Sequence, residues 1–542
     1  MTVANATGSR VDVAIVGGGH NALVAATLLA RTGLSVVVLE RLGHTGGAAV
    51  SERPFPGVDA RLSRYSYLVS LFPDALATEL GLDMELRSRA TASYTPTVRA
   101  GRDCGLLVES APGSTTVESF ADLTGSHAAW IAWKSFYDDV ALLASIVAPT
   151  FLGPLPSAGE LRRRFRDVAG DRADGIWAAL IEEPLGAVLR DRFDDDLVRG
   201  VVATDGLIGT FTSLDDEARL ANRCFLYHLV GNGTGEWRVP VGGMGRLTAS
   251  LGAFAQSAGA EVRTQAEVMA IDADGSTAAV RYVDTRSGVE HEVEATWVLG
   301  GVAPAVLDSL LGPAHSSERP EGAQLKINLV LTRLPRLRSG LDPSLAFAGT
   351  FHVDETAANL ELAHAQASAG QLPDRIPGEL YCHTLTDRSI LGPALDEAGW
   401  HTLTYFGVHT PARLFAGDDR AAVTTTAVTR ALTGLDRYLA EPLADCLAVD
   451  ANGRPCIEVK SPLDIEDELG MPGGHIFHGD LEWPWLPDSS PAPADDPAAA
   501  WGVATSIRNV LLCGAGARRG GAVSGIGGHN AAMALLALTK RR

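Results

Sequence analysis

Residues 11–49 read VDVAIVGGGHNALVAATLLARTGLSVVVLERLGHTGGAA, and this stretch decides the fold. Its first six residues, Val11 to Val16, are mostly β-branched or apolar, as in a strand buried on both faces of a parallel sheet. Gly17, Gly19 and Ala22 follow in G-x-G-x-x-A spacing. The first glycine permits a tight turn, the second lets a pyrophosphate approach the backbone, and the alanine lets a helix lie close to the strand. A diphosphate would then sit at the helix N-terminus.

The rest of the stretch completes a nucleotide-binding unit. Small and apolar residues from Asn21 to Thr32 predict the helix, and Gly33 stands where a left-handed residue would end it. Residues 34–39 predict a second strand. It is followed by Glu40, whose carboxylate can accept hydrogen bonds from both ribose hydroxyls of an adenosine and would repel a 2′-phosphate. A glycine turn without a ligand is the alternative, but strand, glycines, helix, second strand and acid all occur in register.

The residues after Glu40 favour flavin over nicotinamide. Arg41 is followed by Gly46, Gly47 and Ala48, and a glycine pair so close to the second strand offers backbone N–H groups to a phosphate. With these residues the chain resembles the FAD-binding amine oxidase and phytoene desaturase superfamily. The resemblance implies that the arginine lies beside the adenosine and that the glycine pair meets the diphosphate of FAD.

Length, charge and cysteine content limit the classes of protein to consider. A chain of 542 residues exceeds one ordinary hydrophobic core and predicts two domains. Its net charge of −20 argues against a nucleic-acid partner and against a basic patch that docks on anionic lipid. Six scattered cysteines without a C-x-x-C pair predict buried thiols in a reducing compartment. Residues 1–11 lack an apolar core and no long apolar run occurs, so we expect neither a signal peptide nor a membrane span, and a cytoplasmic location.

We expect an α/β fold in which a discontinuous, Rossmann-like FAD-binding domain is joined to a mixed α+β substrate domain. The predicted FAD-binding parts are residues 8–75, 235–304 and 500–542, and the predicted substrate parts are residues 76–234 and 305–499. In the second FAD-binding part, the glycine cluster WRVPVGGMGRL (237–247) opens a helix over 247–258, and strands are predicted over 260–269, 278–283 and 292–300. The resemblance implies that the backbone of Val268 meets the adenine.

The last FAD-binding part follows a low-complexity linker, PDSSPAPADDPAAAW (487–501). A strand over 509–513 ends in Gly514 and Ala515, and residues 521–532 open a final helix. The resemblance implies that this loop and the helix N-terminus cover the ribityl chain, the diphosphate and the O2 side of the flavin. A positive helix end there would stabilise the reduced ring. Gly525 and Ile526 are the residues expected nearest O2.

Polar side chains in the second substrate part are candidates for acid–base work at the flavin. They are His383, Tyr405, His478 and Asp480. The spacing His475-x-x-His478-x-Asp480 imitates a metal-binding set, but flanking glycines and prolines oppose the helix that would bring both histidines to one face. On an extended segment His478 and Asp480 share one face and His475 lies on the other. We therefore expect no metal here, and structural hydrogen bonding remains the alternative to an acid–base role.

Three further segments bear on the substrate side. The resemblance implies that Arg64-Tyr65-Ser66-Tyr67 run toward the flavin ring, although core or surface tyrosines explain the pattern equally well. Residues 141–156 are apolar on all sides and predict a buried helix and loop, or else an apolar entrance or a shallow membrane contact. Residues 202–211, with Tyr227 and His228, narrow the resemblance to the branch of pyridine nucleotide-disulfide oxidoreductase domain-containing protein 2. Within them Asp205 is interpreted as a cap or turn residue rather than a catalytic one.

Together these features predict an FAD-dependent oxidoreductase, either a dehydrogenase or desaturase or an oxidase. It would pass a hydride from a small apolar organic substrate to flavin N5. Resemblance of fold indicates the cofactor better than it indicates the substrate or the direction of reaction. Two alternatives stay open: a redox-neutral isomerase or saturase of an alkene or polyene, and a protein that retains flavin and acts by binding a partner.

Overall fold

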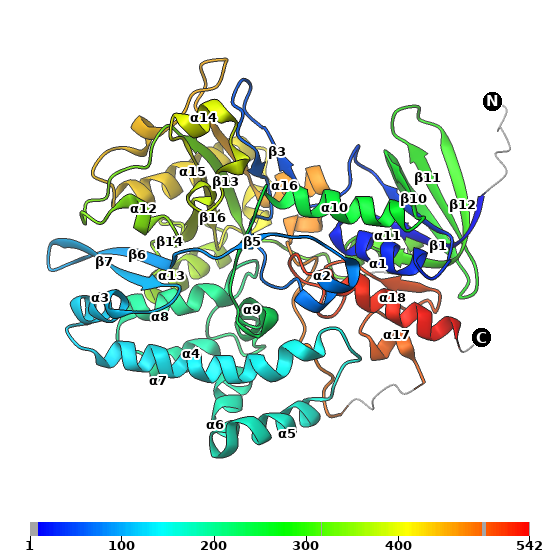
Figure 1. The fold of residues 1–542 in the computed structure, drawn as a ribbon, viewed down its shortest axis with the longest axis horizontal. Helices are drawn as coiled ribbons and strands as arrows, with labels where there is room; N and C mark the ends of the chain where they lie inside the picture. The colour runs from blue at the N-terminus through cyan, green and yellow to red at the C-terminus, as the bar shows by residue number, and fades with distance from the viewer. Residues whose placement is uncertain (1–8, 316, 490–494, 541–542) are drawn as a thin grey trace.

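The computed structural model describes residues 9–315, 317–489 and 495–540, and two seven-stranded sheets organise them (Figure 1). Residues 1–8, which carry the expectation about a signal peptide, lie outside the described residues, as does the centre of the predicted linker, residues 490–494. The described end of that linker contains a short helix, α17 (Pro497–Ala500), where a structureless segment was predicted.

The first sheet has the strand order β10-β11-β12-β1-β2-β9, with β18 paired to β12. The central strands run parallel, whereas β10 and β11 pair antiparallel. Val13 and Ile15 of β1 pack under helices α1, α10 and α18, and Ala14 and Val16 pack on the opposite side with β10, β11 and α11. Both faces of the sheet are thus covered, which explains why the residues of this strand are apolar without alternation. The strands are β1 (Ser9–Val16), β2 (Val36–Glu40), β9 (Glu261–Thr264), β10 (Ala266–Ala273), β11 (Ala278–Asp284), β12 (Glu290–Gly300) and β18 (Val510–Leu512).

This sheet unites three stretches of chain that are far apart in sequence, as expected for a discontinuous Rossmann-like domain. The exact domain boundaries stay predictions. One predicted element is wrong: residues 260–269 form two strands rather than one. Gln265 adopts a left-handed conformation (φ 58°) and interrupts the strand, so that β9 pairs with β2 while β10 pairs with β11.

The second sheet has the strand order β17-β13-β16-β15-β14-β6-β7. One face packs on α12 and α15 in an apolar core, and the other faces the first sheet across a cavity. Strands β6 and β7, at one end of this order, come from the first predicted substrate part, residues 76–234. The strands are β6 (Thr91–Arg99), β7 (Arg102–Glu109), β13 (Leu325–Leu331), β14 (Thr350–Val353), β15 (Gly378–Tyr381), β16 (His401–Gly407) and β17 (Ile457–Lys460). Two small pairs, β3 (Ser51–Glu52) with β4 (Leu62–Ser63) and β5 (Leu86–Arg87) with β8 (Val239–Pro240), complete the strands.

A helical layer around an aromatic core (Figure 1) supplies a further wall of the cavity, with Trp133, Tyr137 and Ile208 among the lining residues. Residues 141–156 belong to it: Leu143, Val147, Phe151 and Leu155 are buried, which supports the buried-helix interpretation. The helices are α1 (His20–Ala30), α2 (Asp74–Leu80), α3 (Ser114–Thr124), α4 (Ala128–Val147), α5 (Ala158–Ala169), α6 (Ala173–Trp177), α7 (Leu185–Arg192), α8 (Asp196–Ala203), α9 (Leu220–Leu229), α10 (Met244–Ser257), α11 (Pro304–Leu311), α12 (Pro343–Ala346), α13 (Ala357–Ser368), α14 (Pro393–Glu397), α15 (Arg420–Asp436), α16 (Pro462–Leu469) and α18 (Ile526–Thr539).

Two expectations from composition can be compared with the structure. All six cysteines are free, and the prediction of buried thiols is confirmed for five of them, whereas Cys104 on β7 is half-buried. In the described ranges, none of the helices combines the length and the apolar character that crossing a membrane requires.

Candidate functional site

A continuous cavity of about 1360 Å³ extends from the glycine turn at the start of α1 to the inner face of the second sheet. Most of the residues predicted to hold a cofactor lie on its wall. Those that line it are Gly17, Gly19, Glu40, Arg41, Gly47, Ala48, Val268 and Ala515. The nucleotide-binding segments of the sequence thus converge on one space.

The glycine turn leaves room that a ligand could occupy. Gly17 is left-handed (φ 88°), which makes the tight turn possible. A Cβ atom added to Gly19 would meet no heavy atom of the described residues within 4 Å, because this position opens into the cavity. Gly19 also precedes α1 as its N-cap without a side-chain cap. The first N–H groups of α1 can therefore bind an anion from the cavity.

Two residues predicted to bind the cofactor, Ala22 and Gly46, act by packing. Ala22 does not line the cavity; a Cβ atom on Gly301, which follows β12, would lie 3.1 Å from the Ala22 Cβ. This close approach is the helix-to-sheet contact expected of the third fingerprint position. Gly46 donates its N–H to the Gly18 carbonyl (2.8 Å), and a Cβ there would lie 2.9 Å from Val50. Gly46 shapes the loop, while Gly47 and Ala48 face the cavity.

Glu40 and Arg41 stand at the end of β2, beside the glycine turn. The Glu40 carboxylate accepts the Gly18 N–H (2.7 Å) and the Leu42 N–H (2.8 Å), which fixes it at the cavity wall. Each oxygen keeps a further lone pair for a hydroxyl donor. Arg41 donates to the Glu468 carbonyl (2.7 Å) and so ties this corner to α16.

The C-terminal loop reaches the cavity through residues other than those predicted. Ile526 is fully buried in the aromatic core, and Gly525 is a left-handed N-cap (φ 70°) packed against Phe72 and Leu76. Gly514 lies against the Gly301 carbonyl, where a Cβ would come within 2.7 Å. The assignment of Gly514, Gly525 and Ile526 to the cofactor wall is corrected accordingly. Ala515, Ala522 and Val523 line the cavity instead.

The structure places only some of the predicted acid–base residues at the cavity. His478 lines the cavity with a left-handed backbone (φ 64°), and burial lowers the pKa of its imidazole to about 4. His383 lies one layer behind, with its ring 5.7 Å from that of Tyr67. Burial lowers the pKa of His383 to about 3.

Tyr405 and Asp480 are no longer candidates. Tyr405 points into the opposite core of the second sheet, and its hydroxyl donates to the Ile376 carbonyl (2.8 Å). Asp480 is 59% exposed and lies 3.7 Å from His475, because turns rather than an extended strand shape this segment. For His475 and Asp480, the structure thus favours the structural alternative given above over an acid–base role.

The inner face of the second sheet carries polar residues that the sequence analysis missed. Across adjacent strands, the cross-strand register aligns His352, Glu379, Phe406, Lys326 and Lys460 in one row. The first four line the cavity. The sequence did carry a signal for these residues, namely a charged side chain within a strand that is otherwise buried. The examples are Lys326 in LKINLVL and Glu379 in GELY. Such residues need partners or a function.

Lys326 lies between Phe406 and Lys460 in this row and is 2% exposed. Its ammonium donates to the carbonyls of Ser63 (3.2 Å) and Tyr65, and it lies 4.3 Å from the ring centroid of Tyr67. Burial holds the pKa of Lys326 well below its usual value. This lowered pKa makes it easier for Lys326 to exchange a proton with a group in the cavity.

The segment predicted to approach the flavin does reach the cavity. Tyr65, Ser66 and Tyr67 line it, whereas Arg64 forms ion pairs with Glu52 and Glu458 behind the wall. Asp205 occupies a single turn after α8, consistent with the turn interpretation, but it also lines the cavity. Burial raises the pKa of Asp205 well above its ordinary value.

Glu379 gives a testable pH dependence of stability. Burial, and then the neighbouring Glu355, raise the pKa of Glu379 from 4.5 to about 7. The folded chain therefore binds more protons than the unfolded chain between these values, so stability falls as the pH rises through this window, by about 3 kcal/mol in full. We expect Glu379→Gln to have a higher melting temperature than wild type at pH 8, and the same melting temperature near pH 4.5. Both proteins are treated with a chelator so that bound metal ions do not affect the comparison.

The exposed Glu397 on α14 supplies the matched control, since Glu397→Gln should track wild type at each pH. A difference between Glu379→Gln and wild type that stays constant with pH would contradict the assignment.

Comparisons with known proteins agree with this geometry. Residues 15–76 match the NAD(P)-binding Rossmann-like domain family. The chain is 49% identical over 536 residues to the uncharacterised protein Rv0897c of Mycobacterium tuberculosis, with 98% of both chains covered. This chain belongs to the same family as that mycobacterial protein.

The family has a more distant relative in Rattus norvegicus, pyridine nucleotide-disulfide oxidoreductase domain-containing protein 2. It is 28% identical over 570 residues, which cover 96% of this chain and 92% of the relative. Cyclohexylamine oxidase from Brevibacterium oxydans shares the fold, with a TM-score of 0.54, 17% identity and coverage of 98% and 100% of the two chains. This chain therefore has the amine oxidase-like fold that the sequence predicted, and the predicted likeness to pyridine nucleotide-disulfide oxidoreductase domain-containing protein 2 is confirmed.

Proposed function

We propose that this protein is an FAD-dependent oxidoreductase that removes a hydride from an apolar organic substrate. The observation that carries the proposal is the continuous cavity, which joins the glycine turn of the first sheet to the inner face of the second. A cofactor at one end and a substrate at the other would meet within one cavity.

The residues at the first end fit FAD. Gly19 and Gly47 leave the cradle in front of α1 open, and Glu40 is held where it can accept ribose hydroxyls. The Asn21 Oδ1 atom is buried there without a hydrogen-bond partner among the described residues. When bound, FAD would supply the acceptor for a hydride.

The other end suits a substrate with a large apolar part. Trp133, Tyr137, Ile208, Trp237 and Phe406 contribute to its walls. These side chains would exclude water and hold the substrate by burial of apolar surface.

Two nitrogen bases face the same space and could accept a proton when the substrate loses one with its hydride. They are Lys326 and His478, and burial favours the neutral form of both.

An anaerobic absorbance spectrum of the purified protein tests the proposal. We expect the bands of oxidised flavin, unchanged by NADH or NADPH, because the electrons are to come from the organic substrate. A panel of apolar alkenes, alcohols and amines, with cyclohexylamine among the amines, should contain a compound that bleaches the bands. Absence of flavin, with no binding of added FAD, would contradict the proposal.

Two other outcomes of this experiment would favour a different function. Prompt bleaching by NADPH would favour the redox-neutral isomerase or saturase, which works with reduced flavin. A flavin that dithionite reduces but no compound of the panel does would favour a binding protein that retains FAD without turnover.

A further inference from the structure

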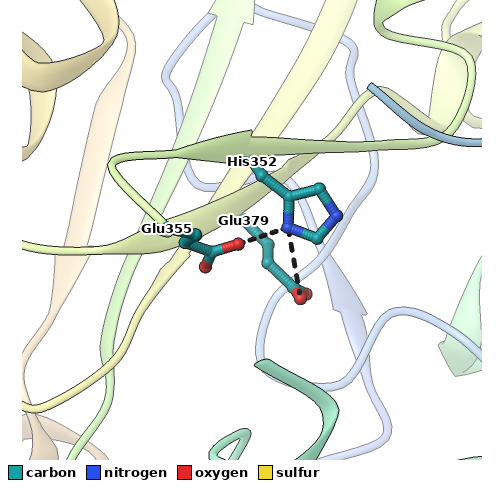
Figure 2. A group of neighbouring side chains, drawn as sticks. All are labelled: His352, Glu355 and Glu379. Atoms are coloured by element: carbon teal, nitrogen blue, oxygen red, sulfur yellow. Dashed lines mark hydrogen bonds and ion pairs between the residues drawn. The ribbon is translucent and has the colours of Figure 1, made fainter. Parts of the chain in front are cut away.

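Three buried side chains at the floor of the cavity form a cluster that the proposed oxidoreductase chemistry does not use. His352 lies on β14, Glu355 follows the turn after that strand, and Glu379 lies opposite His352 on β15. Figure 2 shows both carboxylates turned toward the same imidazole nitrogen, Nδ1 of His352. Glu355 hydrogen-bonds this nitrogen, and a Glu379 oxygen lies 3.9 Å from it. One potential ligand atom from each residue lies within 4.8 Å of the other two.

The cluster is buried but not fully satisfied. His352 and Glu379 are 4% exposed and Glu355 is 1% exposed. The second oxygen of Glu355, Oε1, has no hydrogen-bond partner within residues 9–315, 317–489 and 495–540. A buried carboxylate oxygen without a donor is costly, so its position favours a ligand that this protein chain does not itself supply.

The surrounding charges point to a cation. Asp205 is close enough to Glu355 and Glu379 for their charges to interact, and Arg89 interacts with Asp205, His352 and Glu379. When both are ionised, Glu355 and Glu379 carry two negative charges, which a divalent ion would neutralise.

We propose that His352, Glu355 and Glu379 bind a divalent transition-metal ion. The ion takes the place of the proton shared by His352 and Glu355 and is held by one imidazole nitrogen and two carboxylates. Zn²⁺ or Mn²⁺ suits this mixed set, whereas Mg²⁺ and Ca²⁺ prefer oxygen ligands alone.

Because His352 and Glu379 line the cavity, a coordination position of the ion faces the substrate end. A polar oxygen or nitrogen atom of the substrate would bind there. The site thus adds a polar anchor to a chamber with apolar walls, and its existence does not depend on the identity of the cofactor.

The test measures metal binding by the complete, cofactor-containing protein. Chelator-treated wild type is equilibrated with Zn²⁺, Mn²⁺ or Mg²⁺ and passed through a gel-filtration column, and bound metal is measured by mass spectrometry. We expect one equivalent of Zn²⁺ or Mn²⁺ and no retention of Mg²⁺. In a titration followed by electron paramagnetic resonance, wild type should remove the solution signal of the first equivalent of Mn²⁺.

Variants locate the ion. Glu355→Gln and Glu379→Gln should each weaken binding at least about tenfold, since loss of a ligand exceeds the usual loss of a supporting hydrogen bond. The control is Glu458→Gln, because Glu458 is a largely buried carboxylate in the same sheet that pairs with Arg64 away from the cluster. It should bind metal as wild type does.

Failure of wild type to retain Zn²⁺ or Mn²⁺ would overturn the proposal, as would equal losses in Glu458→Gln and the cluster variants. The wild-type measurements decide the question even where a variant does not fold. The flavin spectrum of the same samples is recorded separately, so a missing cofactor is distinguished from a missing metal.

Discussion

The Gly19→Val variant is expected to fold as wild type and to lose its flavin. Gly19 has φ −68° and ψ 169°, a backbone conformation open to any residue. Within the described part of the chain, no heavy atom lies within 4 Å of the position that its Cβ would take. The valine side chain would instead fill the space in front of the α1 N-terminus, where we propose that the diphosphate binds.

The loss should be large because the diphosphate would forfeit several backbone N–H groups together. We expect the affinity for FAD to fall about 100-fold or more, which corresponds to roughly 3 kcal/mol. Flavin content after purification and a titration of the FAD-free protein by fluorescence measure this change. The melting temperature of the FAD-free variant should equal that of FAD-free wild type.

Gly175→Val is the matched control. Gly175 lies in α6 with open space around its Cβ position and no left-handed conformation, but it is exposed and remote from the cavity. This variant should retain flavin. If Gly19→Val also retains flavin, the cofactor does not occupy the cradle in front of α1.

Gly528→Ala is expected to destabilise the protein severely. A Cβ atom on Gly528 of α18 would lie 1.9 Å from the Asn21 carbonyl oxygen of α1, so the two helix backbones would have to separate. Neither backbone can relieve this overlap by rotating a side chain, and overpacking of this kind costs about 3 kcal/mol or more. We expect a marked fall in melting temperature and in the yield of soluble protein.

The control applies the same substitution where a helix has room for it. Gly252 lies within α10, and its Cβ position is 3.4 Å from the Thr45 hydroxyl, an ordinary contact. Gly252→Ala should therefore leave stability unchanged or raise it by up to about 1 kcal/mol, the gain in helix propensity. A Gly528→Ala variant that melts with wild type would mean that α1 and α18 are not in this close contact.

The two glycine predictions show where sequence interpretation succeeded and where it did not. Gly17 and Gly19 occupy the expected turn, because a strand, a turn and a helix that are contiguous in sequence contact one another directly. The loop and N-terminus of the final helix, with Gly525 and Ile526, were instead assigned to the flavin. The structure shows Gly527 against the Gly514 carbonyl and Gly528 against α1. From sequence, a glycine needed for a ligand and a glycine needed for a close helix contact look the same.

The sequence by itself determined the unit from β1 to Glu40, since its strand, glycine turn, helix and second strand follow one another in the chain and contact one another directly. It could not determine the floor of the cavity. Lys326, His352, Glu379 and Phe406 come from four strands of the second sheet, and only the order β13-β16-β15-β14 places them in one row. That order depends on pairing between distant segments, and a shift of one residue exchanges the two faces of a strand, as Tyr405 and Phe406 show. Tertiary packing therefore decided which of these side chains face the cavity.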